Sequence, residues 1–187
     1  MRLGAIAAVS TALVLGGCNA DYVTGSKAPV LLLIESVNSG VPTLSDVRDD
    51  NGGIFNCQTV VGLRNQLKNP TAVASAVEDV QLGTYEVRYR RSDGRAIEGV
   101  DVPYRITGSL SAFVPAGATA SVTIDLVRHQ AKIEPPLINI SGLAIVTMLA
   151  DITIYGTTVA QQTVSATATT EVTFADFATG TKTCEAQ

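Results

Sequence analysis

The order of hydrophobic and polar residues along this chain is typical of β-strands. In residues 85–90 the side chains alternate, so that Tyr85, Val87 and Tyr89 share one face. A period of two is the spacing of a half-buried strand. Residues 30–34 are instead apolar throughout, which predicts a short buried strand. The alternation recurs at Val102, Tyr104 and Ile106, at Leu110, Ala112 and Val114, and at Val122, Ile124 and Leu126.

The clearest strands are the two nearest the C-terminus, because both are long and rich in β-branched residues. In the first strand, one face is predicted to consist of Val146, Met148, Ala150, Ile152 and Ile154. In the second strand, one face is predicted to consist of Val164, Ala166, Ala168, Val172 and Phe174. Threonines occupy most of the alternate positions of the second strand. Only residues 71–80 carry a helical pattern, and it is weak.

Turn signals separate these strands, at residues 50–53, 69–70, 92–94, 115–117 and 135–136. About seven short strands with regular turns predict an all-β fold, a two-sheet sandwich of the immunoglobulin or fibronectin type III kind. A small barrel is the alternative. The chain has no tryptophan, so the buried Trp of antibody-type domains is missing. The pattern therefore indicates the architecture and not that family.

The N-terminal eighteen residues have a different pattern. Arg2 precedes an uncharged apolar stretch from Leu3 to Leu15, which is the layout of a secretory signal. The stretch is shorter than the ~18–20 residues that span a bilayer. It ends in Leu15-Gly16-Gly17-Cys18, which resembles the lipobox of bacterial lipoproteins. The resemblance implies cleavage before Cys18 and a lipid on its sulfur, whereas an ordinary signal with a chance cysteine is the alternative.

Segments of the following chain also resemble uncharacterised bacterial lipoproteins that have no assigned activity. These segments are Tyr-Arg-Arg-Ser-Asp-Gly at 89–94, Gly-Val-Asp-Val-Pro at 99–103 and Val-Arg-His-Gln-Ala-Lys-Ile-Glu-Pro-Pro at 127–136. The expected organisation is a signal peptide at 1–17, a lipidated N-terminus and polar tether at 18–28, and a β-sandwich domain at 29–187. The residue after the cysteine is Asn19 and not the aspartate that usually retains such proteins in the inner membrane. We therefore expect a cell-envelope protein, attached by lipid to the outer membrane.

The cysteine count agrees with that compartment. Lipidation of Cys18 would leave Cys57 and Cys184, and in an oxidising space two remaining cysteines predict a disulfide. Two unpaired thiols are the alternative. Closing so long a loop stabilises a fold by roughly 4–5 kcal/mol in chain-entropy models. With 13 basic and 17 acidic side chains and no basic run, the chain lacks the electrostatic pattern of nucleic-acid binding.

Few residues point to chemistry. The chain has one histidine, His129, and no Gly-x-Ser-x-Gly sequence, so a Ser-His-Asp or Cys-His site has little support. Clustered Cys and His ligands for zinc and glycine-rich phosphate loops are missing too. We expect no cofactor. A calcium site is a hypothesis for the loop from Asp46 to Gly53, where Asp46, Asp49, Asp50 and Asn51 carry oxygen ligands. A solvated turn is the favoured interpretation, because the spacing is not that of an EF-hand and Arg48 opposes a cation.

Arg88, Arg90 and Arg91 form a basic group on the same predicted strand as Glu86. Cross-strand ion pairing or a solvated face is the expected role, and ligand binding is the alternative. Taken together, these features predict a non-enzymatic binding or structural module. It would be held on a membrane by its lipid and would contact another envelope protein through a strand edge or its loops. The alternative is a carbohydrate-active or other hydrolase with an unrecognised carboxylate site.

Overall fold

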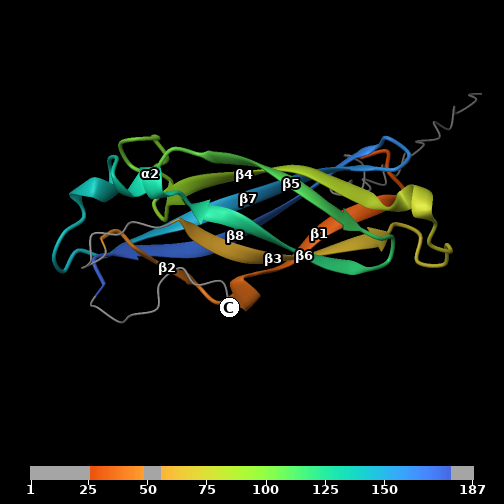
Figure 1. The fold of residues 1–187 in the computed structure, drawn as a ribbon, viewed down its shortest axis with the longest axis horizontal. Coiled ribbons are helices and arrows are strands. Elements are labelled where there is room, and N and C mark those ends of the chain that lie inside the picture. The colour runs from red at the N-terminus through yellow and green to blue at the C-terminus, as the bar shows by residue number, and fades with distance from the viewer. Residues whose placement is uncertain (1–25, 49–55, 178–187) are drawn as a thin grey trace, which may run out of the picture.

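The computed structural model describes residues 26–48 and 56–177, and β-strands make up most of these ranges. The strands form two sheets that pack against each other (Figure 1), so the predicted all-β, two-sheet architecture is confirmed. The strands are β1 (Val30–Val37), β2 (Thr43–Asp46), β3 (Cys57–Leu67), β4 (Val80–Arg91), β5 (Ile106–Val114), β6 (Thr119–Val127), β7 (Val146–Thr158) and β8 (Thr163–Ala175). The short helical turns are η1 (Asn38–Gly40), η2 (Ala76–Glu78), α2 (His129–Lys132) and η3 (Leu137–Asn139).

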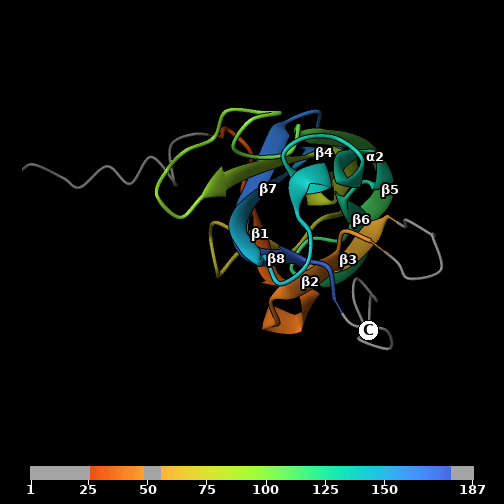
Figure 2. The ribbon, with the colours of Figure 1, turned by 90° about the vertical axis from the view of Figure 1, so that its left-hand side faces the viewer.

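One sheet has the strand order β1-β3-β6 and the other has the order β2-β8-β7-β4-β5. Neighbouring strands are antiparallel, except that β2 runs parallel to β8. The chain thus leaves one sheet after β1 and joins the other at β2. Left-handed backbone at Asn38, Ser39 and Gly40 makes this crossover, a conformation that glycine and asparagine adopt more readily than other residues. Viewed end-on, the strands surround a common core (Figure 2).

The core between the sheets follows the predicted alternation. The buried hydrophobic residues of β7 are Met148, Ala150, Ile152 and Ile154, and those of β8 include Val164, Ala166, Val172 and Phe174. In β4 the alternation slips by one residue, because a bulge interrupts the pairing between Leu82 and Thr84. A bulge adds one residue to a strand and so changes which side chains face inward. Leu82 and Tyr85 therefore both reach the core although they are three residues apart.

Two local predictions differ from the structure. Residues 102–106 do not form a strand of their own, because Pro103 has no backbone N–H to donate. Strand β5 begins only at Ile106 and extends through the predicted strand at 110–114. Residues 71–80 contain a single 3-10 turn, η2, in place of a helix. Its capping box joins Ser75 and Glu78, and the Ser75 N–H donates to the Glu78 carboxylate at 3.0 Å.

Candidate functional site

The two lateral seams of the sandwich, where the edge strands of one sheet face those of the other, differ in how they are closed. At one seam β5 faces β6, and the tight turn between these strands closes one end with a hydrogen bond from the Ala118 N–H to the Pro115 carbonyl at 3.0 Å. At the other end the Arg128 guanidinium donates to the Arg105 carbonyl at 3.3 Å. This seam is therefore bridged by hydrogen bonds at both ends.

Two tyrosines of β4 form hydrogen bonds with the C-terminal end of β6 from inside the core. Tyr89 is buried, and its hydroxyl donates to the carbonyl of Leu126. Leu126 is the extra residue of a bulge in β6, because Cys57 pairs with Val127 and Gln58 pairs with Asp125. The Tyr85 hydroxyl accepts a hydrogen bond from the Asp125 N–H at 3.1 Å. Burial raises the pKa of both tyrosines, so both remain neutral hydroxyls.

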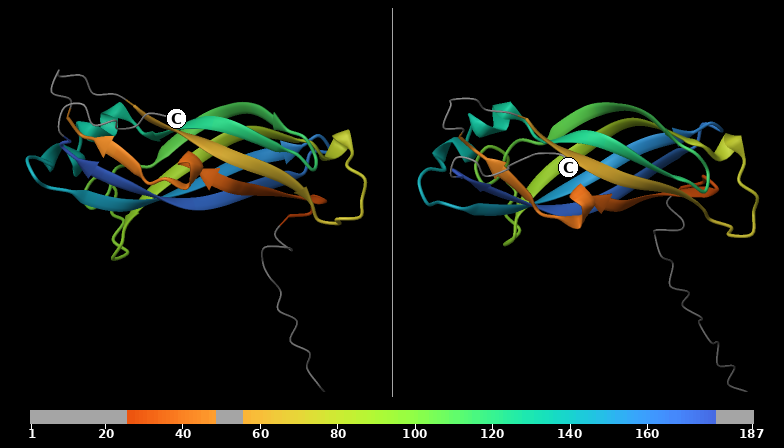
Figure 3. Two further views of the ribbon diagram at one scale, coloured as in Figure 1. Left: turned by 90° about the horizontal axis from the view of Figure 1, so that it is seen from below. Right: turned by 60° about the horizontal axis from the view of Figure 1, so that its bottom comes forward.

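The opposite seam, between β1 and β8, is open. Within the described residues β1 pairs with β3 alone. Strand β8 pairs with β7 along its length, and β2 covers its other edge only from Val172 to Ala175. The edge of β8 from Thr163 to Glu171 therefore faces β1 without a ladder of hydrogen bonds between them, and the two strands lie side by side (Figure 3).

A groove runs along this open seam as two adjoining hollows. The first has a volume of about 720 Å³ and is lined by residues 30–34 of β1, residues 163–167 of β8 and Tyr155. The second, of about 390 Å³, is lined by residues 34–37 of β1 and residues 168–171 of β8, with Gly40 and Pro42 at its end. Ile34 lines both hollows, so the two form one continuous groove between β1 and β8.

The walls of the first hollow are aliphatic on one side and rich in hydroxyl groups on the other. Leu31, Leu33 and Ile34 are half-buried, whereas the hydroxyl residues of β8 that line the hollow are exposed. Natural edge strands are usually protected by charges, proline or a covering segment. In β1 the only charge is Glu35. Strand β1 is therefore an apolar strand whose free edge lacks most of the usual protection against pairing with another chain.

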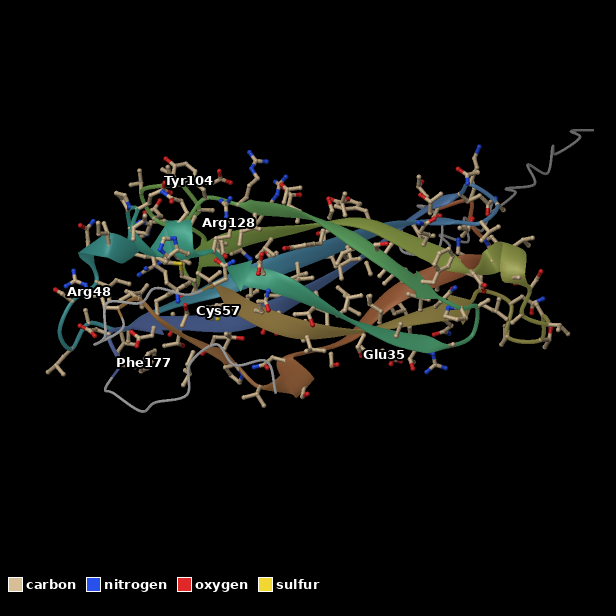
Figure 4. All side chains as sticks on the ribbon, viewed as in Figure 1. Glu35, Arg48, Cys57, Tyr104, Arg128 and Phe177 are labelled. Atoms are coloured by element: carbon tan, nitrogen blue, oxygen red, sulfur yellow. The ribbon has the colours of Figure 1, made fainter. Side chains whose placement is uncertain are left out.

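The hydrogen bonds around Ser26 define one end of the groove. Its hydroxyl donates to the Thr163 carbonyl at 2.8 Å, and the Lys68 ammonium donates to the Ser26 carbonyl at 2.7 Å. The opposite end is acidic, since Glu35 and Glu171 both line the second hollow. Figure 4 labels Glu35 far from Tyr104 and Arg128, which lie toward the end of the sandwich that carries α2. The groove thus has the shape to hold an extended chain along its walls, and its acidic end would place the carboxylates of Glu35 and Glu171 beside one end of that chain.

Several residues singled out from the sequence lie elsewhere. Cys57 is fully buried at the first position of β3, but Cys18 and Cys184 lie outside the described residues, so the lipid site and the disulfide stay predictions. His129 is exposed at the start of α2. Asp49, Asp50, Asn51 and Gly53 also lie outside the described residues. In the ranges 26–48 and 56–177, no three His, Cys, Asp or Glu residues are grouped closely enough to hold a metal ion.

Two arginines of the basic group on β4 form ion pairs, one within β4 and one across to β7, whereas Arg91 has no ion pair among the described residues. Arg88 pairs with Glu86 at 2.9 Å, and Arg90 pairs with Asp151 of β7 at 2.8 Å. Burial acts to raise the pKa of Asp151, but hydrogen bonds from Arg90 and Thr169 outweigh it and lower that pKa. These charges lie on the outer face of the five-stranded sheet, and none of them lines the groove.

Sequence reasoning missed both the groove and one buried cation. Lys132 of α2 is buried, and this burial lowers the pKa of its ammonium group, although the charge of Asp46 opposes the shift. The one sequence signal in this region is the apolar run at residues 30–34, and it predicts a short buried strand without indicating a groove beside it.

Neither a scan against known protein families nor a search of curated proteins finds a match for this chain. In the part of the chain that the structure describes, no helix has the length and apolar character needed to cross a bilayer.

Proposed function

We propose that this chain is a lipoprotein of the bacterial envelope, anchored through Cys18, whose sandwich domain is a non-enzymatic module that binds an extended segment of another envelope protein. The open β1–β8 seam is the observation that carries the binding proposal. Strand addition at a free sheet edge supplies affinity through main-chain hydrogen bonds, and pockets for side chains supply specificity. The groove offers both, since it has free strand edges and an aliphatic wall.

We also propose that the domain belongs to the immunoglobulin and fibronectin type III class of sandwiches. The strand order supports this assignment. In immunoglobulin nomenclature β1, β3 and β6 would be strands A, B and E of one sheet, and β8, β7 and β4 would be G, F and C of the other. Strand β2 would be the second half of a split strand A. Loss of the antibody-type tryptophan is compatible with the architecture, because two sheets can pack around aliphatic residues.

A hydrolase is the second candidate, because glycoside hydrolysis requires two carboxylates that flank the scissile bond. Glu35 and Glu171 line the second hollow from different strands. However, Glu35 is paired with Arg64 at 3.3 Å, and its side chain is 43% exposed. Neither carboxylate lies in an apolar pocket, which is the surrounding that makes a carboxyl group a general acid. The groove is therefore better suited to holding a chain than to cleaving one.

The anchor and the binding surface can be tested on the same sample. The chain is produced in bacterial cells with a photo-crosslinking amino acid at Leu33, in the groove, or at Thr123, which is exposed on β6. We expect crosslinked product from position 33 and none above background from the control position. Mass spectrometry of the purified chain is expected to find Cys18 as a lipid-modified N-terminus.

The two readouts have separate consequences. An unmodified Cys18 still preceded by residues 1–17 would contradict the envelope assignment. Equal crosslinking from positions 33 and 123 would contradict the groove as the binding surface, whatever the state of Cys18. A Cys18→Ser variant is the control for the anchor, because it removes the sulfur to which the lipid would be attached.

A further inference from the structure

The groove differs in chemical character along its length, and this asymmetry bears on what it binds. The first hollow has an aliphatic wall of Leu31, Leu33 and Ile34, and the Tyr155 phenol is the one ionisable side chain that lines it. The second hollow carries two carboxylates, Glu35 and Glu171. The inference drawn from this difference rests on the proposed function, because it concerns the segment that the same groove would take.

The vacant edge of β8 continues a strand position that β2 already uses. Strand β2 pairs with β8 in parallel from Val172 to Ala175, so the edge from Thr163 to Glu171 lies directly in line with it. Nine residues of strand extend over about 30 Å at ~3.3 Å each. An extended segment of five to nine residues, by the same spacing of roughly 3.3 Å, fits along this edge with one face against the aliphatic wall of β1.

The charges at the acidic end are not balanced. Arg64 pairs with Glu35, but within the described residues no lysine or arginine forms an ion pair with Glu171. The neighbour of Glu171 on β7 is the uncharged Leu149. Glu171 is exposed on the free edge of β8, at the point where the groove ends against β2. A cation in the bound segment would meet an uncompensated carboxylate at this position.

We propose that the groove takes an extended peptide segment with apolar residues at alternate positions and a lysine or arginine at the end that lies beside Glu171. Alternate apolar side chains would contact the outward Leu31 and Leu33, and the cation would pair with the Glu171 carboxylate. Segments that carry an acidic residue at that end are rejected by like-charge repulsion.

The test is selection of a random twelve-residue peptide library, displayed on phage, against the purified full-length chain. We expect the selected peptides to be enriched in lysine or arginine relative to the unselected library, and to alternate apolar and polar residues. Binding of the selected peptides is then measured by fluorescence anisotropy against variants. Glu171→Gln should weaken binding about twofold to fivefold, as expected for one exposed ion pair, and Glu171→Lys about tenfold.

Three controls make the result specific. Glu134→Gln changes a carboxylate that lines neither hollow of the groove, and should leave binding unchanged. Leu33→Asp places a charge on the aliphatic wall and should abolish binding, while its thermal unfolding shows whether the domain still folds. Replacing the peptide's cation by glutamate should restore binding to Glu171→Lys, since the charges are then exchanged.

Failure of this inference can be distinguished from failure of the proposed function. Selected peptides that lose binding with Leu33→Asp but show no basic enrichment, or bind Glu171→Lys unchanged, would overturn the charge preference and leave the groove as a binding surface. Peptides that bind Leu33→Asp normally, or a selection that yields no binding peptide, would overturn the groove itself.

Discussion

At the scale of single residues, two tyrosines of β4 show how a polar group can stabilise a sandwich from within. Strand β6 is an edge strand, and the bulge at Leu126 turns a carbonyl away from its partner strand. A buried carbonyl without a donor is costly. The Tyr89 hydroxyl donates to it from the opposite sheet, 37 residues away in the chain. The sequence pattern places Tyr89 on an inward face, but it contains no sign that the hydroxyl has this partner.

Tyr89→Phe is expected to destabilise the domain by about 1–3 kcal/mol, because it leaves the Leu126 carbonyl buried and unpaired. The measurement is urea unfolding, with a lower midpoint and an unchanged slope. Tyr155→Phe removes the same atom from an exposed position and should change stability by less than about 0.5 kcal/mol. Equal effects of the two variants would show that the buried hydroxyl contributes no particular stability.

At the scale of the element, β1 shows the limit of pattern analysis. Residues 30–34 are all apolar, and such a run is typical of a strand covered on both faces. The inward residues Val30 and Leu32 are buried in the core as expected. The outward residues Leu31 and Leu33 are half-buried beside the groove instead. The run thus predicts a strand at residues 30–34 correctly, but it does not predict that the outward face of this strand is partly open to solvent.

Leu32 and Leu33 provide a matched pair for this difference, being the same residue type at adjacent positions. Leu32→Ala should destabilise the domain by about 2–5 kcal/mol, since Leu32 is only 4% exposed and its loss leaves a cavity in the core. Leu33→Ala should destabilise it by about 1 kcal/mol or less, because solvent already reaches that side chain. Urea unfolding of both variants measures the difference. Similar losses of stability would mean that Leu33 is structural and that the groove is not a free surface.

At the scale of the whole molecule, the two seams of the sandwich differ in how many hydrogen bonds connect the strands across them. The β5–β6 seam is joined by a turn, by two tyrosine hydroxyls and by Arg128. Among the described residues, the β1–β8 seam is closed at one end by β2, which pairs with the end of β8, and at the other end by the hydrogen bond from Ser26 to Thr163, with no strand pairing between these ends. A domain that needed no partner would gain by closing both seams, because free strand edges favour unwanted association. This asymmetry is the property of the entire fold on which the proposed binding function rests.

The predicted disulfide between Cys57 and Cys184 also concerns the whole chain, because it would tie the C-terminal end to the first residue of β3. Cys184→Ser should lower the unfolding free energy by about 2–5 kcal/mol. This variant leaves the buried Cys57 in place and so avoids a cavity in the core. In the presence of a reducing agent, the variant and the natural chain should unfold at the same denaturant concentration. Equal midpoints without reductant would contradict the disulfide.

The all-β class and most strand positions could be predicted from the chain alone, because the alternation of side chains is a local property that burial of one face imposes. The same local logic failed at residues 102–106, where the missing N–H of Pro103 matters more than hydrophobicity. The prediction of a signal peptide and a lipobox in residues 1–18 also depends on local sequence alone.

The groove could not be predicted in this way. A side-chain pattern reports how apolar the surroundings of each residue are, but it does not report which backbone edges find a partner. That depends on pairing between distant segments, such as β2 with β8 and Tyr89 with Leu126. The open seam between β1 and β8 is a consequence of these long-range pairings, and so it becomes visible only when the strands are arranged in space.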